Sequence, residues 1–147
     1  MWEEGGRRKG DGERVQDRPT YDELLQAVER FLDAEIVPNV EGARGFHARV
    51  AANVVRLIRR ELDSEEEHLA TEWAGLNALL GVAARPDDHA ALRKTLAARN
   101  AELCERIRSG DADSEPFAQQ VREHVRRTVR DKLSVSDPGL LERPSSI

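Results

Sequence analysis

The stretch from Phe46 to Leu62 constrains the fold more than any other part of the chain, because its apolar residues recur at helical spacing. At about 100° per residue they fall on one side of a helix, and a set of arginines falls on the other. The apolar positions are Phe46, Val50, Val54, Leu57, Ile58 and Leu62, and the basic positions are Arg49, Arg56, Arg59 and Arg60. This pattern predicts an amphipathic helix.

Polar residues interrupt this apolar side. His47 projects into its middle, Asn53 lies at its edge, and Asn100 falls inside the apolar stripe of a later helix. A buried polar side chain without a hydrogen-bond partner costs about 1–3 kcal/mol. We therefore expect His47 and Asn100 to be buried and bonded to backbone carbonyls or helix ends, where they fix the helix register. A binding role for these residues is the alternative.

Capping motifs predict where the first and third helices begin. Thr20 and Glu23 have the spacing of a capping box, and the apolar face that follows them continues until Pro38. Ser64 and Glu67 have the same spacing, which predicts that a separate third helix starts there.

Two further helices are expected in the C-terminal half. Gly81 is a candidate C-terminal cap of the third helix, and Asp87 or Asp88 can cap the fourth. The fifth is expected to start near Ser114, with Pro116 in its first turn. The residues expected to face inward on these two helices are Leu92, Leu96, Leu103, Ile107, Phe117, Val121, Val125 and Thr128.

The whole pattern predicts an all-α protein, folded as a single-domain up-and-down helical bundle of about five helices. The chain has 147 residues, its apolar residues are mostly Ala, Leu and Val, and only 4% of its residues are aromatic, which suits packed helices better than a sheet. Residues 1–18 are Gly-rich and charged, and we expect a disordered arm there. Residues 19–133 form the expected bundle, and residues 134–147 an irregular tail.

Composition also narrows the partners. A net charge of -5 argues against a nucleic-acid binder, since such proteins carry a basic surface. No apolar run approaches the roughly 20 residues needed to cross a membrane. Arg7, Arg8 and Lys9 are followed by no apolar stretch, so we expect neither a signal peptide nor a membrane partner, but a cytoplasmic protein.

No set of residues predicts catalysis. Glu65 and His68 make one Glu-x-x-His unit, whereas a carboxylate di-iron site needs two. His89 and His124 have no partner three or four positions away that would complete a site. A single cysteine, Cys104, excludes a Cys-rich metal site. We expect no metal, no cofactor and no enzymatic activity, although a pocket around His47 would be the place for an acid–base pair.

The expected fifth helix carries the most basic surface of the chain. Arg122, Arg126 and Arg130 follow one another at single-turn spacing and could meet phosphate groups or a partner's carboxylates. A solvated helix face is the simpler interpretation. The functional alternative is a self-associating helical module that binds an anionic ligand, such as the phosphates of CoA, through these arginines.

The octet Phe46-His-Ala-Arg-Val-Ala-Ala-Asn53 resembles a small bacterial family of unassigned function. The family pattern opens with Arg-Pro and a Leu-Leu-x-Ala-Val helix, here from Arg18 to Val28. Its tail, Lys-Leu-x-Val-x-Asn-Pro, corresponds to residues 132–138, where Asp137 replaces the usual Asn. The resemblance spans about residues 18–141.

Members of that family resemble companions of aminoglycoside-phosphotransferase-like kinases and are encoded beside them and beside acyl-CoA dehydrogenase-like proteins. Related kinases phosphorylate hydroxyacyl-CoA substrates with the help of a small accessory protein. The resemblance therefore implies a non-catalytic accessory or regulatory subunit of such a kinase in acyl-CoA metabolism. The expected contact residues are Arg49, Asn53 and Arg56, with His47 locking the helix behind them.

Overall fold

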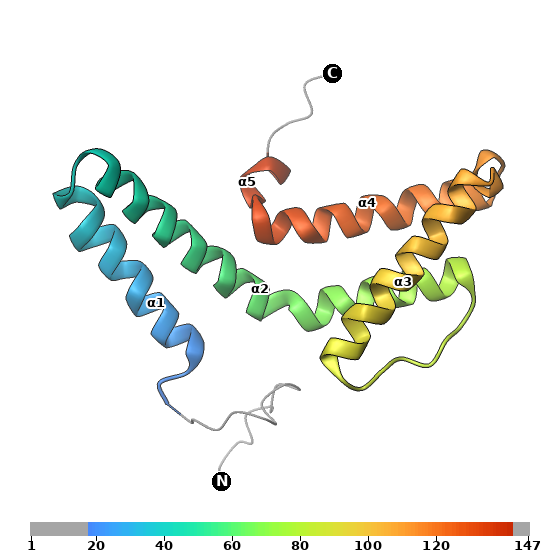
Figure 1. Ribbon diagram of the computed structural model, residues 1–147, viewed down its shortest axis with the longest axis horizontal. Coiled ribbons are helices and arrows are strands. Elements are labelled where there is room, and N and C mark those ends of the chain that lie inside the picture. Colours follow the sequence, from blue (N-terminus) through green and yellow to red (C-terminus); the bar gives the residue numbers. More distant parts are fainter. Residues whose placement is uncertain (1–17, 143–147) are drawn as a thin grey trace, which may run out of the picture. The chain divides into compact units, whose positions relative to one another are not determined.

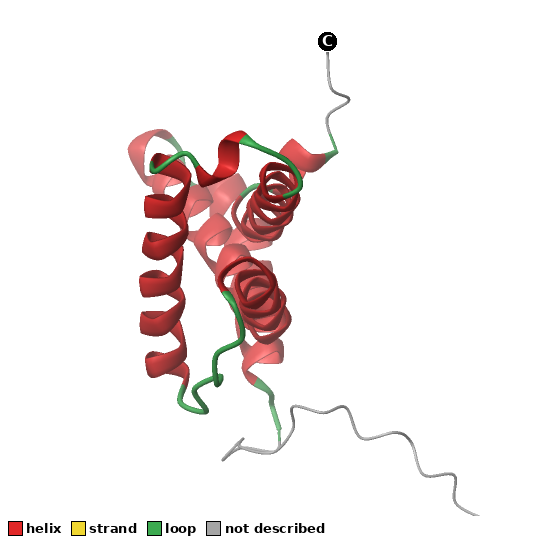
Figure 2. Cartoon of the chain, turned by 90° about the vertical axis from the view of Figure 1, so that its right-hand side faces the viewer, coloured by secondary structure: helices red, strands yellow, loops and turns green. Residues whose placement is uncertain are grey.

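The computed structural model describes residues 18–142. They form five α-helices and three short segments of other helix types, with no strand among them (Figure 2). The predicted all-α class and the number of helices are confirmed. The predicted disordered arm lies outside the described residues except for Arg18, and so do residues 143–147 of the predicted tail.

The described residues form two compact units. The N-terminal unit comprises residues 18–59, and the C-terminal unit comprises residues 60–142. One long helix, α2 (Gly42–Leu80), runs through both units (Figure 1). This division differs from the single bundle expected over residues 19–133, because most apolar burial is concentrated in the second unit.

The N-terminal unit is a helical hairpin. Its first helix, α1 (Tyr21–Phe31), starts at the predicted capping box. The Thr20 hydroxyl accepts a hydrogen bond from the Glu23 amide at 3.2 Å, and the Glu23 carboxylate accepts one from the Thr20 amide at 2.7 Å. The segments η1 (Leu32–Ile36) and η2 (Val37–Asn39) then lead into the first half of α2.

The predicted break at Ser64 is wrong, because α2 continues through it for 39 residues in all. A serine caps a helix only where the preceding chain is not helical. Here the Ser64 hydroxyl donates to the Arg60 carbonyl at 2.7 Å, one turn earlier in the same helix. No Gly or Pro lies near Ser64 to interrupt the helix. The helix ends as predicted, before Gly81, whose φ of 91° suits glycine.

The C-terminal unit adds three helices to the second half of α2. They are α3 (His89–Arg108), α4 (Phe117–Ser136) and the short α5 (Pro138–Leu141), with η3 (Asp111–Asp113) between the first two. Asp88 caps α3 as predicted, accepting from the Ala91 amide at 2.7 Å. In the described part of the expected irregular tail, residues 134–136 complete α4, Asp137 interrupts the helix, and residues 138–141 form α5.

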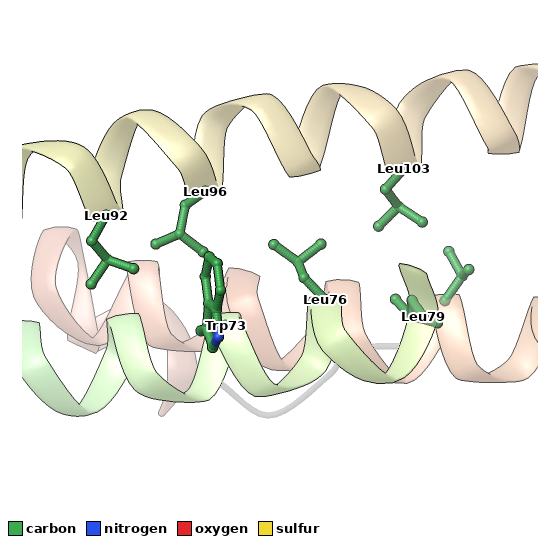
Figure 3. Close-up of a cluster of buried hydrophobic side chains, with 7 residues drawn as sticks. Trp73, Leu76, Leu79, Leu92, Leu96 and Leu103 are labelled. Atoms are coloured by element: carbon green, nitrogen blue, oxygen red, sulfur yellow. The ribbon is translucent and has the colours of Figure 1, made fainter. Parts of the chain in front are cut away.

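The core of the C-terminal unit joins α2, α3 and α4. Leucines of α3 point at α2, where Trp73 and two further leucines meet them (Figure 3). Leu76 and Leu92 are completely enclosed. Two predicted inward positions, Ile107 and Val125, are exposed instead. The core residues are Trp73, Leu76, Leu79, Leu92, Leu96, Leu103 and Val121.

The N-terminal unit differs from this core in which residues it buries. The residues that it buries are small, namely Gly45, Ala48 and Ala52 on α2. Seven of its large apolar side chains are 40–58% exposed, although their spacing predicted an inward face. They are Leu24, Val28, Phe31, Phe46, Val50, Val54 and Ile58. Small residues let two helices approach closely, so the apolar stripe of α2 is turned away from α1.

Candidate functional site

Ion pairs join α1 to α2 in the N-terminal unit. Arg56 donates to Glu29 at 3.0 Å and also bonds Asp33. Arg59 donates to Glu29 at 2.6 Å and to Asp22 at 2.8 Å. Glu29 is thus held by two guanidinium groups, and both arginines are committed within the hairpin. Arg56, a predicted partner contact, therefore acts here as a link between helices.

These contacts favour the charged forms of Asp22, Arg56 and Arg59. The hydrogen bond from Arg59 holds the pKa of the Asp22 carboxyl below its ordinary value. The hydrogen bond to Asp33 raises the pKa of the Arg56 guanidinium, and those to Asp22 and Glu29 raise the pKa of Arg59. Partly exposed pairs contribute little net stability. They fix the geometry of the hairpin more than they stabilise it.

One flank of the hairpin carries exposed polar side chains, which lie beside the exposed Phe46 on α2. Arg49 and Asn53, both predicted contact residues, are exposed, and their side chains form no hydrogen bond or ion pair with any other residue between 18 and 142. At about 100° per residue they lie within about 40° of each other on α2. Arg30 of α1 is exposed on the same flank and is also unpaired within this range. We call Arg30, Arg49 and Asn53 the polar flank.

The opposite flank is apolar. Ile58 lies about 180° around α2 from Arg49, because nine positions at 100° make two and a half turns. In α1, Leu24, Val28 and Phe31 recur every three or four residues and share one side. Since the helices are antiparallel and Glu29 faces α2, that side lies on the flank of Ile58. We call the following set the apolar flank: Leu24, Val28, Phe31, Val54 and Ile58.

The two polar residues that were predicted to be buried differ in their exposure. His47 is exposed, so the prediction of a buried position is wrong; it follows from the outward turn of the whole apolar stripe. Asn100 is half-buried and donates to the Glu72 carboxylate at 2.7 Å. Asn100 therefore links α3 to α2, as a register-fixing residue would, but through a side chain rather than a backbone carbonyl.

The arginines of α4 are exposed, as a solvated face requires. Arg122 bonds Glu115, which lowers the pKa of that carboxyl. Arg126 and Arg130 make no hydrogen bond or ion pair within the described part of the chain. The three predicted anion-binding residues thus lie on one helix, but only two of them have free guanidinium groups.

His124 is a buried histidine whose burial the sequence pattern did not predict. His124 of α4 is 6% exposed and lies against α2 at Gly75. Burial lowers the pKa of its imidazole; the nearby Glu72 opposes this effect, and Arg127 and Lys132 add to it. The available signal was spacing, because position 124 follows the inward positions Phe117 and Val121 by seven and three residues.

Neither a metal-binding cluster nor a membrane span is found in the described residues. No group of three or more His, Cys, Asp or Glu side chains in the range 18–142 is placed to hold a metal ion. The paired Glu66 and His89 side chains are 3.2 Å apart, but Glu66 also binds Arg85. Within the same range, every helix is too short or too polar to span a membrane.

A known family covers most of the chain. Residues 38–140 match a family described as "Domain of unknown function (DUF6285)". The chain belongs to this family. The DUF6285 region contains the octet from Phe46 to Asn53 and begins after α1. No curated protein and no solved structure matches the chain. Membership of a family of unknown function is thus confirmed, whereas the kinase partner implied by the resemblance stays a prediction.

Proposed function

We propose that the protein is a non-catalytic accessory subunit of an aminoglycoside-phosphotransferase-like kinase that acts on hydroxyacyl-CoA substrates in the cytoplasm. The kinase is suggested by the resemblance of the octet at Phe46–Asn53. The observation that supports a docking role is the polar flank, where Arg30, Arg49 and Asn53 are exposed and free of partners among the described residues.

The side chains of this flank have the groups that a docking contact with the kinase needs. Two guanidinium groups can bind carboxylates of the kinase, and the Asn53 amide can both donate and accept a hydrogen bond. Arg56, one turn after Asn53, is neutralised by Glu29 and Asp33 and holds the docking helix in place. Binding activates the kinase if the flank fits its active conformation better than its inactive one, because a ligand shifts an equilibrium only by its difference in affinity.

The test is to co-express the protein with the kinase encoded beside it and to measure both the complex and the kinase activity. We expect co-purification and a kinase activity that depends on the protein. Arg49→Glu should weaken the complex at least tenfold, and Arg127→Glu, a matched exposed arginine on α4, should not. An unchanged kinase activity together with no complex at micromolar concentration contradicts the proposal.

A second candidate function is the binding of an anionic ligand on α4. Arg126 and Arg130 support it, since both are exposed, one turn apart and unpaired within residues 18–142. Calorimetry with CoA as the probe tests it. Binding that weakens with salt and is lost in Arg126→Glu supports this function, and the absence of heat with CoA argues against it.

A further inference from the structure

The hairpin is stabilised in an unusual way. Charged side chains join α1 to α2, through Arg56, Arg59 and Glu29, while large apolar side chains face outward. Exposed ion pairs typically contribute no more than about 1 kcal/mol each. Burial of apolar surface is the dominant favourable term in folding and association. The outward apolar residues are therefore the main source of stability that the hairpin leaves unused.

We infer that the apolar flank binds the same flank of a second copy of this chain. The result is an isologous dimer, in which the same surface of both copies meets across a two-fold axis. Two hairpins supply four helices, the number that encloses a core in a four-helix bundle. The core of this bundle is formed by both copies of the apolar flank.

The exposed apolar area of the flank is the first reason to infer a second copy of the chain as its partner. The five side chains of the apolar flank are 40–56% exposed. They leave on the order of 500 Å² of apolar surface per copy, so that a pair buries about 1,000 Å², where specific interfaces begin. An interface of this size gives a dimer that dissociates on dilution, rather than an obligate one.

Charge is the second reason. A flank that meets itself brings like charges together unless they are neutralised beforehand. The charged residues between the two helices are paired within the hairpin: Arg56 with Glu29 and Asp33, and Arg59 with Asp22 and Glu29. The charges that lie between the apolar residues of this flank are thus paired, and Arg30 and Arg49 lie on the opposite flank. The exposed Arg44 is about 40° from Ile58 around α2, but about 15 Å before Val54 along the helix. The pairing is independent of the proposed kinase docking.

The test measures the mass of the full chain in solution by sedimentation velocity, from low to high micromolar concentration and without any other protein. We expect a shift with concentration from the 16.5 kDa chain to twice that mass. Val28→Asp and Ile58→Asp should each weaken self-association at least tenfold. The matched control Asn53→Asp adds the same charge on the polar flank of the same hairpin and should leave the dimer intact.

Two outcomes overturn the inference. One is a wild-type monomer at every concentration, which means that another part of the chain or a different partner covers the flank. The other is a dimer that survives both flank variants. Circular dichroism verifies that each variant is folded. If a variant is not, hydrogen exchange of the wild type decides: protection of residues 21–31 and 50–59 must rise with protein concentration, and constant protection rejects the pairing.

Discussion

The imidazole of His124 occupies the space that a side chain at position 75 would need. A Cβ atom added to Gly75 would lie 2.2 Å from Nδ1 of His124, well inside van der Waals contact. Gly75 is in the middle of the second half of α2, where a glycine costs about 0.5–1 kcal/mol relative to alanine. The close approach of α4 is the physical reason for a glycine there.

Gly75→Ala should therefore destabilise the C-terminal unit, although the same change in an exposed helix is stabilising. We expect a loss of about 1–3 kcal/mol in the free energy of unfolding, because the new methyl group pushes α4 away from α2. Urea unfolding measures it. Adding His124→Ala to the variant provides the control, since removing the ring should recover part of the loss. An unchanged or raised stability of Gly75→Ala rejects the close contact.

The stability of the C-terminal unit should fall when the pH drops below about 6.5. Burial lowers the pKa of His124 below that ordinary value. The unfolded chain then binds a proton that the folded unit excludes, so the contribution of the neutral ring is complete above about pH 6.5 and is lost as the pH falls through the lowered pKa. Unfolding in urea should need less denaturant at about pH 5.5 than at about pH 7.5.

A variant separates His124 from the other titrating groups. His124→Gln lacks the titrating ring, and its stability should change less over the same pH interval. The carboxyls of Asp22, Glu66 and Glu115 have lowered pKa values, so their contributions are lost only in more acidic solution. Equal pH dependence in the wild type and in His124→Gln would show that other groups carry the effect.

The position of each helix could largely be predicted from sequence, but the burial of its faces could not. Helical period and capping are local, and the caps at Thr20, Asp88 and Gly81 were each correctly predicted. Burial depends on which neighbour a helix meets. The row that includes Phe46 and Ile58 has the period of a core face, yet α1 packs on the alanines of α2 instead.

The same difference between local signals and contacts between helices explains which features of the candidate site could be predicted. The arginines of the octet helix were predicted on its polar side, and Arg49 lies there. The acidic partners of Arg56 are 23 and 27 residues away in the sequence. Spacing along one helix carries no information about such contacts. The burial of His124 was not predicted for a related reason: a histidine is polar by type, and its spacing from possible metal ligands carries no information about its place among the inward positions.

Arg99 should matter more for stability than its partly exposed position implies. It lies over the Trp73 ring at 5.2 Å and donates to the carbonyls of Leu76 and Gly81 at 3.1 and 2.7 Å. The Gly81 carbonyl follows the C-terminal end of α2 and Leu76 is in its last turns, where a cation also interacts favourably with the helix dipole. We expect Arg99→Leu to cost about 1–3 kcal/mol in urea unfolding.

Arg99→Lys is the sharper variant at this position. An ammonium group keeps the charge but lacks the planar fork that reaches both carbonyls while stacking on the indole. Its loss of stability should therefore approach that of Arg99→Leu. Arg126→Lys, on an exposed arginine without partners among the described residues, is the control and should be nearly neutral. A wild-type stability of Arg99→Lys would show that charge alone is sufficient.

The two units should respond differently to the removal of apolar side chains. Leu76 is completely enclosed, and Leu76→Ala should cost about 2–5 kcal/mol, since the core around it cannot collapse fully. Val54 is 48% exposed, unlike Leu76.

In dilute solution, where the chain is not self-associated, Val54→Ala should change the free energy of unfolding by less than about 0.5 kcal/mol. At high concentration the same variant should lose stability relative to the wild type, because binding to the folded state stabilises it by mass action. Urea unfolding at two protein concentrations measures both effects, and a Val54→Ala loss that is independent of concentration means that its side chain is covered within its own chain.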